Sequence, residues 1–576
     1  MIEVRPTIMD RMVSAFSPER GLKRVAARAS LVAATSMTAG RSPVEPGGKI
    51  WGRGGYKGGH KDRRQTRGWF ARSRSANGDV LGDQKTLIAR SRDAAMNMPL
   101  ATAAVERPIT FTVGTGLMAI PDLKPAELGI SEDEALALSS TIAADFDNYM
   151  ASTDPDAERT ATGYDQQEIV LRGVLESGDI AALRVMPEDQ PGRRHETAWK
   201  LVEADRILSP AAHHEGGRLA TAGGRDGRGE EQGNICAGGV EVDSYGAPVA
   251  YHLLKRAPDS FGGLTRMART EGDTVRIEAW GDATDLPSVV HVMAKRRPEQ
   301  FRGVSILAPV LETLKQVSDL TEAELFAAVM QAMVAIIYKS PGAQAMPEPD
   351  YGEAGTAEAA RGQSDGARPL ADYRLESGTV LEIDSDAGAE MKSPGRPNPA
   401  FDPFFVALAK QIAAAIDVPF EVLMLSFTAS YSASRGALEV FYLSVRKRRG
   451  WLASHWCSPV YRAWLFEQVA KGRYRMHGFL TNAEMRERWS NVRFRGDGKI
   501  SLDPAREAKA LEVQEAHAWS TGAEITAELN GGDYDANVRR RIGEHQRFVA
   551  GGLPIPNAKG GGSEPAEAHR EREETE

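Results

Sequence analysis

The longest regular pattern of apolar and polar residues in the chain begins at residue 401. In the stretch FDPFFVALAKQIAAAI, apolar side chains recur at steps of three and four residues, as on one face of a helix. Pro419 has no backbone N–H and disfavours helical geometry at Val418, so we expect this helix to end at Val418. A polar loop with the sequence LSFTASYSASR, residues 425–435, is expected after the break.

A second amphipathic helix is predicted from Gly436 to Gly472. Most of the large aromatic residues of the C-terminal half lie in it: Phe441, Tyr442, Trp451, Trp456, Tyr461, Trp464 and Phe466. Glycine and proline weaken a helix interior, so Gly450 and Pro459 are expected to bend or divide it.

Further helices are predicted on both sides of this central stretch. Residues 83–107 are expected to form two short helices, separated at Met98-Pro99. Residues 136–150 and 164–175 also have helical patterns, and residues 304–338 predict a long helix with a joint near Asp319 and Thr321. Nearer the C-terminus, a helix is expected at residues 481–489, and another at Asp503-Pro504, where proline suits the first turn.

Strands are predicted where short runs of alternating apolar and polar residues are separated by Gly, Pro and Asp. Residues 108–123 (PITFTVGTGLMAIPDL) predict one strand, with Gly114 and Gly116 allowing a tight turn. From residue 179 to 300 several short strands are expected, among them a hairpin with Tyr245-Gly246 near its turn.

Several of these pieces together resemble the portal proteins of tailed bacteriophages, in the family typified by phage lambda. The pieces are RSRDAAMNMP followed by VGTGL, VVHV followed by an RGxS turn, the IAAAIDVPFEVL break, YSASR, and LDPAREAKA. The motif residues that match are Tyr431, Ser432, Ser434, Arg435, Asp503 and Pro504. The resemblance covers about residues 91–544. The chain departs from the family pattern at Ser430 and Arg506, where the family usually has Asn and Lys.

The resemblance implies an α+β portal-type fold with wing, stem, clip and crown regions. The expected division is a basic Gly/Arg-rich arm (1–82), wing (83–160), stem helix (161–178), strand-rich, clip-like region (179–300), long stem helix (301–340), wing return (341–430), aromatic helix near the tunnel (431–475), helical crown (476–555) and disordered tail (556–576).

Composition agrees with a multidomain globular protein. The chain has 576 residues, 41% hydrophobic and 26% charged, and no run of eighteen apolar residues that predicts a membrane span. Cys236 and Cys457 are its only cysteines. Two distant thiols indicate assembly in a reduced compartment and exclude a disulfide framework.

Charge is distributed unevenly along the chain. The net charge is −8, yet residues 1–92 contain 19 Lys/Arg and 7 Asp/Glu, so a basic arm precedes an acidic body. Gly and Arg alternate there with Trp51, Tyr56 and Trp69, a composition that suits stacking and phosphate contact. Two other interpretations stay open: a solvated leader, and an arm that orders against a neighbouring subunit, which the resemblance favours.

Candidate catalytic and metal sites are weak. His213 and His214 are adjacent, so their side chains point apart, and no further ligand has a familiar spacing. Asp282, Asp285 and His291 suggest acid–base chemistry, but without a nucleophile they are better explained as turn and strand residues. Phosphate-binding, nucleophile-elbow and zinc-protease motifs are missing, which argues against the packaging ATPase and a prohead protease. We expect no enzyme activity, cofactor or metal.

The expected function is that of a portal. By resemblance, twelve copies form a ring at one capsid vertex, contact the terminase large subunit, the capsid and scaffold proteins and the head-completion or tail adaptor proteins, and pass double-stranded DNA without sequence specificity. The subunit is expected to assemble in the host cytoplasm, without a membrane, and to reside in the virion.

Candidates for DNA contact in the channel are the basic residues Arg435, Arg446, Lys447, Arg448 and Arg449. The alternative interpretation of these residues is a solvated helix face or ion pairs between subunits. Two alternative functions are a nucleic-acid-binding protein that acts through its arm, and a hydrolase built on the sheet of residues 180–300.

Overall fold

A computed structural model describes residues 64, 66, 68–187, 190–210, 234–256, 273–281, 284–340, 379–384, 399–427, 430–499, 504–532 and 534–552. The chain divides into two compact units, Met1–Ser73 and Arg74–Glu576, and the elements described below all belong to the second. Most of the predicted basic arm, residues 341–378 of the predicted wing return and the predicted tail at 556–576 lie outside the described residues.

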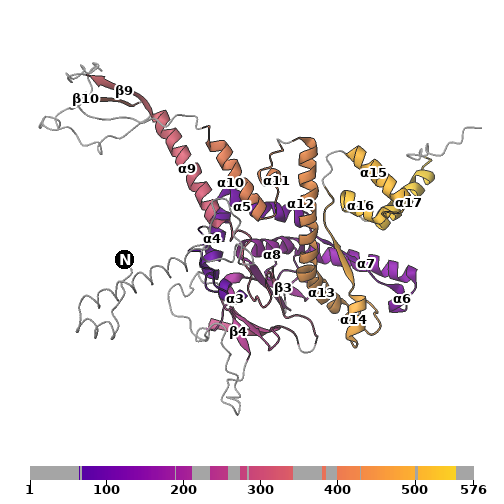
Figure 1. The fold of residues 1–576 in the computed structure, drawn as a ribbon. Coiled ribbons are helices and arrows are strands. Elements are labelled where there is room, and N and C mark those ends of the chain that lie inside the picture. The colour runs from indigo at the N-terminus through magenta and orange to yellow at the C-terminus, as the bar shows by residue number, and fades with distance from the viewer. Residues whose placement is uncertain are drawn as a thin grey trace, which may run out of the picture. The chain divides into compact units, whose positions relative to one another are not determined.

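Helices make up most of the described structure (Figure 1). They are α3 (Ala76–Val80), α4 (Gln84–Asn97), α5 (Pro99–Thr112), α6 (Pro125–Leu128), α7 (Glu132–Ala151), α8 (Gly163–Ser177), α9 (Leu311–Met333), α10 (Phe401–Ala415), α11 (Phe420–Met424), α12 (Tyr431–Leu452), α13 (Ser458–Ala470), α14 (Ala483–Trp489), α15 (Pro504–Ala516), α16 (Gly522–Asn530) and α17 (Tyr534–Ala550). A 3₁₀ turn, η2, covers Ala204–Arg206, and a π-helical segment, η5, covers Ala453–Cys457.

The strands form small sheets. They are β1 (Met118–Pro121), β2 (Asp179–Val185), β3 (Ala198–Glu203), β4 (Ile235–Ala237), β5 (Val240–Val242), β6 (Pro248–Leu254), β7 (Thr274–Glu278), β8 (Val289–Met293), β9 (Val334–Ser340), β10 (Thr379–Asp384) and β11 (Val492–Arg495). One antiparallel sheet has the order β3-β2-β8 and another β4-β5-β6-β7. Strands β1 and β11 pair antiparallel, and β9 and β10 pair parallel.

Two buried clusters hold these elements together. The larger contains aromatic side chains from distant segments: Phe146 packs edge-on against Trp464 at 5.1 Å between ring centroids, and Trp199 against Trp456 at 5.5 Å. The smaller joins Ala181 and Val202 of the three-stranded sheet to residues of β5 and β6. The strand-rich region therefore consists of two small sheets that pack on each other through apolar side chains. The three-stranded sheet also packs on the helices.

Several predicted elements are confirmed. Helices α4 and α5 separate at Met98, which is extended because Pro99 follows it. Helix α8 begins with a capping box, in which the side chains of Thr162 and Asp165 each accept from the other's backbone N–H. The β5–β6 hairpin turns at Gly246, whose φ is +82°, and α15 begins at Pro504.

The predicted strand over residues 108–123 is wrong in its first half. Helix α5 continues to Thr112 with Pro108 inside it, and only Met118–Pro121 is a strand. The helix continues because Val105, Ile109 and Thr112 share one buried face. Gly114 and Gly116 do form the predicted turn, both with positive φ.

The predicted helix over residues 304–338 is too long at both ends. It begins at Leu311, because residues 305–310 form turns that pack on α8, and it ends at Met333, where β9 begins. No joint occurs at Asp319 or Thr321. Instead, the Thr321 hydroxyl donates to the carbonyl of Val317 within the helix.

Candidate functional site

The motif YSASR lies inside helix α12, not in the predicted loop. Ser430 is the N-cap, and its hydroxyl accepts a hydrogen bond from Ala433 N at 3.4 Å, so the helix begins at Tyr431. Ser432 is exposed and Ser434 is buried. Asp503 lies outside the described residues, whereas Pro504 opens α15.

Helix α12 also continues through Gly450, where a bend was predicted. It ends at Leu452 and passes into the π-helical segment η5, and Pro459 then occupies the first turn of α13 (Figure 1). Proline is tolerated there because its missing N–H has no carbonyl partner in that turn. The division of the long helix is therefore confirmed near Pro459 and wrong at Gly450.

The basic run at residues 446–449 does not form one charged face. Each step along a helix rotates the side chain by about 100°, so four consecutive residues point in different directions. Arg446 and Lys447 are exposed, whereas Arg448 and Arg449 are partly buried against other elements. The structure therefore separates the five channel candidates into residues that hold the fold together and residues that face outward.

Arg449 joins three segments of the chain. Its Nε and Nη2 donate to the carbonyls of Thr112 and Phe111 at 2.9 and 3.0 Å, at the C-terminal end of α5. Its Nη1 donates to Asp497 O at 2.8 Å. A cation at a helix C-terminus satisfies carbonyls that have no partner inside the helix. Burial lowers the pKa of Arg449, and nearby Asp497 opposes that shift.

Arg448 holds the break between α10 and α11. Its Nη2 donates to Ile416 O at 2.9 Å, while Asp417 has a left-handed backbone with φ +58°. The Asp417 carboxylate accepts from Ser444 Oγ at 2.7 Å, which ties the same break to α12 a second time. Burial lowers the pKa of Arg448, with Asp417 opposing the shift. Arg448 therefore serves the Asp417-Val418-Pro419 break and does not face open solvent.

Of the remaining three candidates, Arg446 and Lys447 are exposed and Arg435 is partly buried. Arg435 and Arg446 each lie 3.7 Å from a carboxylate of the C-terminal helices, Glu507 and Glu528 respectively. The Arg446 pair is exposed, and such pairs contribute about 0–1 kcal/mol, whereas the Arg435 pair is partly buried. Lys447 is exposed and, within the described part of the chain, makes no hydrogen bond or ion pair. Lys447 is thus the candidate whose charge is most available to an external anion.

A cavity of about 590 Å³ separates α12 from the C-terminal helices. Basic residues on its walls include Arg446, Arg493 and Lys499, and acidic ones include Glu524 and Glu528. Lys499 lies over the Tyr442 ring at 5.8 Å and pairs with Glu439 of α12. The walls carry both signs of charge, so the cavity does not favour an anionic ligand over a cationic one.

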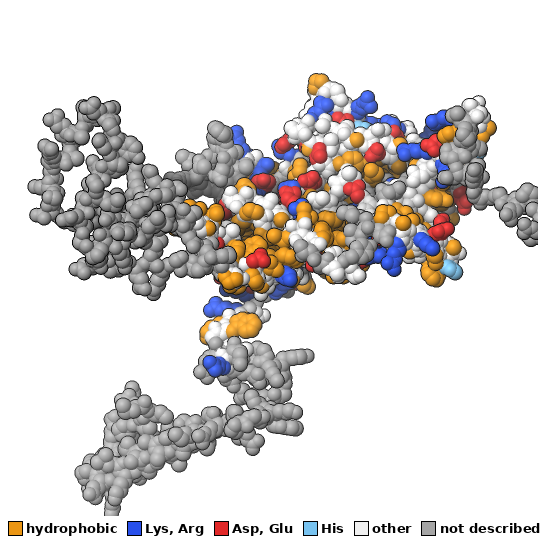
Figure 2. All heavy atoms as spheres, turned by 90° about the horizontal axis from the view of Figure 1, so that it is seen from above, with side chains coloured by type: hydrophobic (Ala, Val, Ile, Leu, Met, Phe, Trp, Pro, Cys, Tyr) orange, Lys and Arg blue, Asp and Glu red, His pale blue; other side chains and the backbone are white. Residues whose placement is uncertain are grey.

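The upper surface of this unit also exposes hydrophobic side chains in patches between charged ones (Figure 2). Exposed apolar residues on α10, α11 and α12 include Phe404, Val440 and Leu443, each more than half exposed. Gly436 lies on the same side of α12 as Val440 and has no atom within 4 Å of the place where a Cβ would be. This face of α12 has no partner within the described chain.

The RGxS turn, Arg302–Ser305, is the centre of a buried hydrogen-bond network, which the sequence did not predict. Arg302 is only 1% exposed, and its guanidinium binds the Asp179 carboxylate twice, at 2.7 and 3.0 Å. It also donates to the carbonyls of Ala204, Ile207 and Gly238. Gly303 N donates to the same carboxylate at 2.8 Å. These bonds connect the end of α8, the two sheets and the approach to α9.

Gly303 and Ser305 of this turn also make close contacts with the end of α8. A Cβ on Gly303 would lie 1.9 Å from Gly178 O, so the two backbones touch. Ser305 Oγ donates to Leu175 O at 3.0 Å and accepts from Leu307 N. The motif was recognised in the sequence only as a polar turn, because its distant partners lie 64 to 130 residues earlier in the chain.

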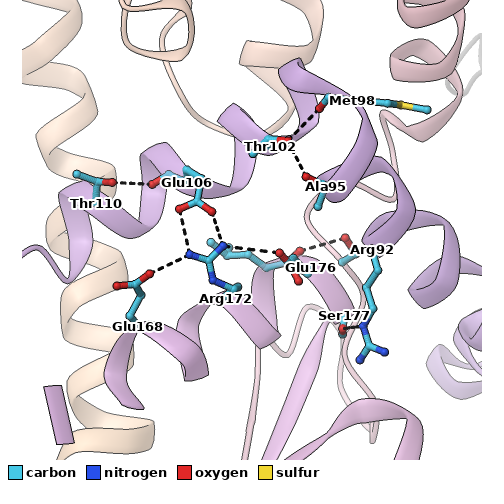
Figure 3. A network of polar contacts seen from close by, with 12 residues as sticks. Arg92, Ala95, Met98, Thr102, Glu106, Thr110, Glu168, Arg172, Glu176 and Ser177 are labelled. Atoms are coloured by element: carbon cyan, nitrogen blue, oxygen red, sulfur yellow. Dashed lines mark hydrogen bonds and ion pairs between the residues drawn. The ribbon is translucent and has the colours of Figure 1, made fainter. Parts of the chain in front are cut away.

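A second polar network joins α5 to α8 (Figure 3). The guanidinium of Arg172 lies between Glu106 and Glu168, with Nη2 at 3.0 and 2.9 Å from their oxygens, and Glu176 is 3.9 Å away. Burial raises the pKa of Glu176, and Arg172 opposes the rise. One arginine thus neutralises several carboxylates at the junction of these helices.

The acid–base candidates are not brought together. His291 lies beside Asp179, at 3.4 Å between Nε2 and Oδ2, with a side chain only 5% exposed. Asp285 is exposed and lies 3.6 Å from Arg486. Asp282, His213 and His214 lie outside the described residues. Within the described ranges, no group of three or more His, Cys, Asp or Glu residues could hold a metal ion.

No described helix is both long enough and apolar enough to cross a membrane.

The sequence was also compared with models of known protein families. The sequence model of the family described as phage portal protein, lambda family, matches residues 62–449. The chain belongs to this family.

Two curated portal proteins are similar to this one over most of their length. The portal protein of Escherichia phage N15 is 23% identical over 524 residues, which cover 88% of this chain and 91% of the relative. Portal protein B of Escherichia phage lambda is 22% identical over 511 residues, which cover 85% of this chain and 89% of the relative. The predicted portal function is confirmed at the level of the family.

Solved structures also match this portal protein. A chain in the virion of a native gene transfer agent particle is 15% identical, with a TM-score of 0.37, and covers 83% of this chain and 96% of that one. A chain in the neck of the same kind of particle, computed with C12 symmetry, has a TM-score of 0.33. The comparisons give no support to the alternative of a nucleic-acid-binding protein that acts through its arm.

Proposed function

We propose that this portal protein is the subunit of a closed ring at one capsid vertex, through which double-stranded DNA enters and leaves the head. The observation that carries the proposal is the family match over residues 62–449, together with portal relatives that align over 85% or more of the chain. We take the role to be structural, since His291 is buried beside Asp179 and apart from Asp285.

The domain division is part of this proposal. Helix α9 suits the proposed long stem helix (301–340), and α10, which packs beside it, falls in the proposed wing return (341–430) (Figure 1). Helix α8 has many buried residues, which favours a place in the central body over the stem predicted for residues 161–178. The helices after residue 476 remain the proposed crown.

The proposed partners follow from the portal role. A ring at a vertex contacts capsid and scaffold proteins, then the terminase large subunit during packaging, and finally the head-completion or tail adaptor proteins. We place the ring in the virion after assembly in the host cytoplasm. Lys447, with Arg446 beside it, is the proposed point of DNA contact, because both are exposed on α12.

The assembly state of the purified chain tests the proposal. Since one subunit has a mass of 62.4 kDa, twelve copies in a ring give about 750 kDa. Light scattering with negative-stain microscopy should show such particles with a central hole. A chain that stays monomeric or dimeric at every concentration and salt would contradict the proposed ring.

A further inference from the structure

The three C-terminal helices α15, α16 and α17 lie together beside α12 (Figure 1), but they share no core with it. None of their described residues is buried, and neither buried cluster contains one of them. The larger cluster, with its partly buried members included, ends at Phe494 of β11. Most helical stability in proteins comes from packing of an apolar face. Contacts of another kind therefore hold these helices against the rest of the chain.

The interface between α12 and these helices contains two cavities. The cavity of about 590 Å³ described above is one of them. The second, of about 200 Å³, lies between Arg435 and Glu439 of α12 and Leu511 of α15. Lys499 lines both cavities. Protein interiors leave few voids larger than a water molecule, so an interface with two such spaces is not closely packed.

Two ion pairs cross this interface from α12. Arg435 Nη2 lies 3.7 Å from Glu507 Oε1 on α15, and Arg446 Nη2 lies 3.7 Å from Glu528 Oε1 on α16. The backbone adds a hydrogen bond from Lys499 N to Glu528 O at 2.9 Å. Dissolved ions screen charges that water can reach, over a distance of about 10 Å at 0.1 M salt. Each of the two pairs is therefore expected to weaken as the ionic strength rises.

The joint between α16 and α17 is attached more closely than the rest. A Cβ on Gly531, which ends α16 with φ +64°, would lie 3.1 Å from Gly496 O, so the two backbones are in contact there. Arg495 also donates to Gly532 O from the end of β11. These contacts fix the joint to the strand, whereas α15 and the first turns of α16 face the cavities.

We infer that α15, α16 and α17 form a lid on α12, which opens about the joint at Gly531. The pairs Arg435–Glu507 and Arg446–Glu528 keep this lid closed. Parts of a protein with few buried apolar contacts are those that open at the lowest cost in free energy. While the lid is closed, its carboxylates occupy two of the five basic channel candidates, and opening releases both arginines. All of these contacts lie within one copy, so the inference does not depend on the proposed ring.

Chemical labelling of lysine measures the opening on the full chain. The Lys499 side chain, between α12 and the lid, is only 19% exposed, whereas Lys447 is exposed on α12 and serves as an internal reference. Acetylation of Lys499 relative to Lys447, measured by mass spectrometry, should rise about threefold or more between about 0.05 M and about 0.5 M salt. E507Q/E528Q and R435Q/R446Q should each show this rise already at the lower salt concentration, because each removes one side of both pairs.

A double-mutant cycle separates the pairs from other effects of these substitutions. The variant with all four changes should be no more open than either parent, because the same pairs are already broken. E512Q/E515Q removes two charges from exposed positions of α15 and should behave like the unaltered chain. Circular dichroism confirms that the variants keep their helices, and mass photometry that the compared samples have the same assembly state.

Three results would overturn the lid. The first is labelling of Lys499 in E507Q/E528Q that equals labelling in the unaltered chain at low salt. The second is an equal rise in E512Q/E515Q, which would make the effect one of general charge. The third is an additive effect of the two parent variants in the combined one, since residues that act through a shared pair are not additive.

Discussion

Gly114 lies directly against the carboxylate of Asp497: a Cβ added to Gly114 would be 1.9 Å from Asp497 Oδ2. The same oxygen accepts from Thr115 N at 2.8 Å, so the turn after α5 is held by a residue almost four hundred positions further along the chain. Arg449 binds both sides of this contact, through the carbonyls of Thr112 and Asp497. The glycine of the VGTGL motif thus makes room for a carboxylate that joins two segments far apart in the chain.

Replacement of Gly114 by alanine should destabilise the chain. Its φ of +57° is unfavourable for a residue with a Cβ, and the contact with Asp497 must also be displaced. We expect a loss of about 1–3 kcal/mol in the free energy of unfolding, measured by chemical denaturation. Gly436→Ala is the matched control, because it lies in α12 with free space around it and should be neutral or stabilising. Equal effects of the two changes would contradict this account.

The Arg302–Asp179 pair predicts a much larger effect. Arg302→Met leaves the carboxylate of Asp179 buried without its cation, which costs about 3–5 kcal/mol. The double change Arg302→Met with Asp179→Asn should be less destabilising than Arg302→Met alone, because no unpaired charge remains. Arg297→Met, which breaks a half-exposed pair with Asp79, should cost under about 1 kcal/mol.

Glu241 gives the clearest prediction of pH dependence. Burial alone would raise its pKa, but hydrogen bonds from Arg276 and Asn234 lower it to about 2. The folded-state pKa is below the unfolded value of about 4.3, so this carboxylate stabilises the fold above that pH. That contribution is lost as the pH falls from about 4.3 towards 2.

The measurement is the free energy of unfolding as a function of pH for Glu241→Gln. This variant should show a shallower loss of stability below pH 4.3 than the unaltered chain, since it has no proton to take up at that site. Glu278→Gln is the control, because Glu278 binds the same arginine but is exposed. An identical acid profile for Glu241→Gln and the unaltered chain would rule out this role.

The elements that could be predicted from the sequence are those whose start, end or turn is set by one or two neighbouring residues. The separation of α4 from α5 at Pro99, the hairpin turn at Gly246 and the start of α15 at Pro504 each depend on one residue with restricted or permissive backbone geometry. The errors arose where tertiary contacts decide the outcome. Pro108 is tolerated inside α5 because the helix around it packs in the core.

The orientation of the candidate site residues was even harder to predict from the sequence, because it depends on contacts with distant segments. Helical rotation alone implies that residues 446–449 cannot all face a channel, but not which of them turn inward. Arg449 is turned inward by carbonyls of α5, which lie about 340 residues earlier in the chain. Arg302 was likewise visible only as part of a turn, since its partners are on β2 and in the sheet connections. Residues that bind distant backbone groups leave no periodic pattern in the sequence.

Both thiols should be unreactive in the folded chain. Cys236 and Cys457 are almost completely buried, and burial raises the pKa of the Cys457 thiol far above its usual value. The reactive thiolate is therefore scarce as well as inaccessible. With a chromogenic disulfide reagent at pH 8, we expect no reaction under native conditions and two thiols per chain in denaturant. Rapid reaction of one native thiol would show that its surroundings open.

Substitution of Arg449 should lower the stability of the chain, whereas substitution of Lys447 should affect its function. The two residues are only two positions apart in α12. Arg449→Met removes three hydrogen bonds to carbonyls and should cost about 2–4 kcal/mol of stability. Lys447→Glu removes an exposed charge without a partner and should change stability by under about 0.5 kcal/mol.

If Lys447 faces DNA in the ring, Lys447→Glu should reduce the amount of DNA packaged per capsid while ring assembly stays normal, because a carboxylate repels the phosphate backbone. Lys447→Arg should preserve packaging, since it keeps the charge. Nuclease-protected DNA per particle is the measurement, with ring mass as its control. Full packaging by Lys447→Glu would exclude Lys447 from the channel contact and leave exposed Arg446 and partly buried Arg435 as the cations of α12 to test.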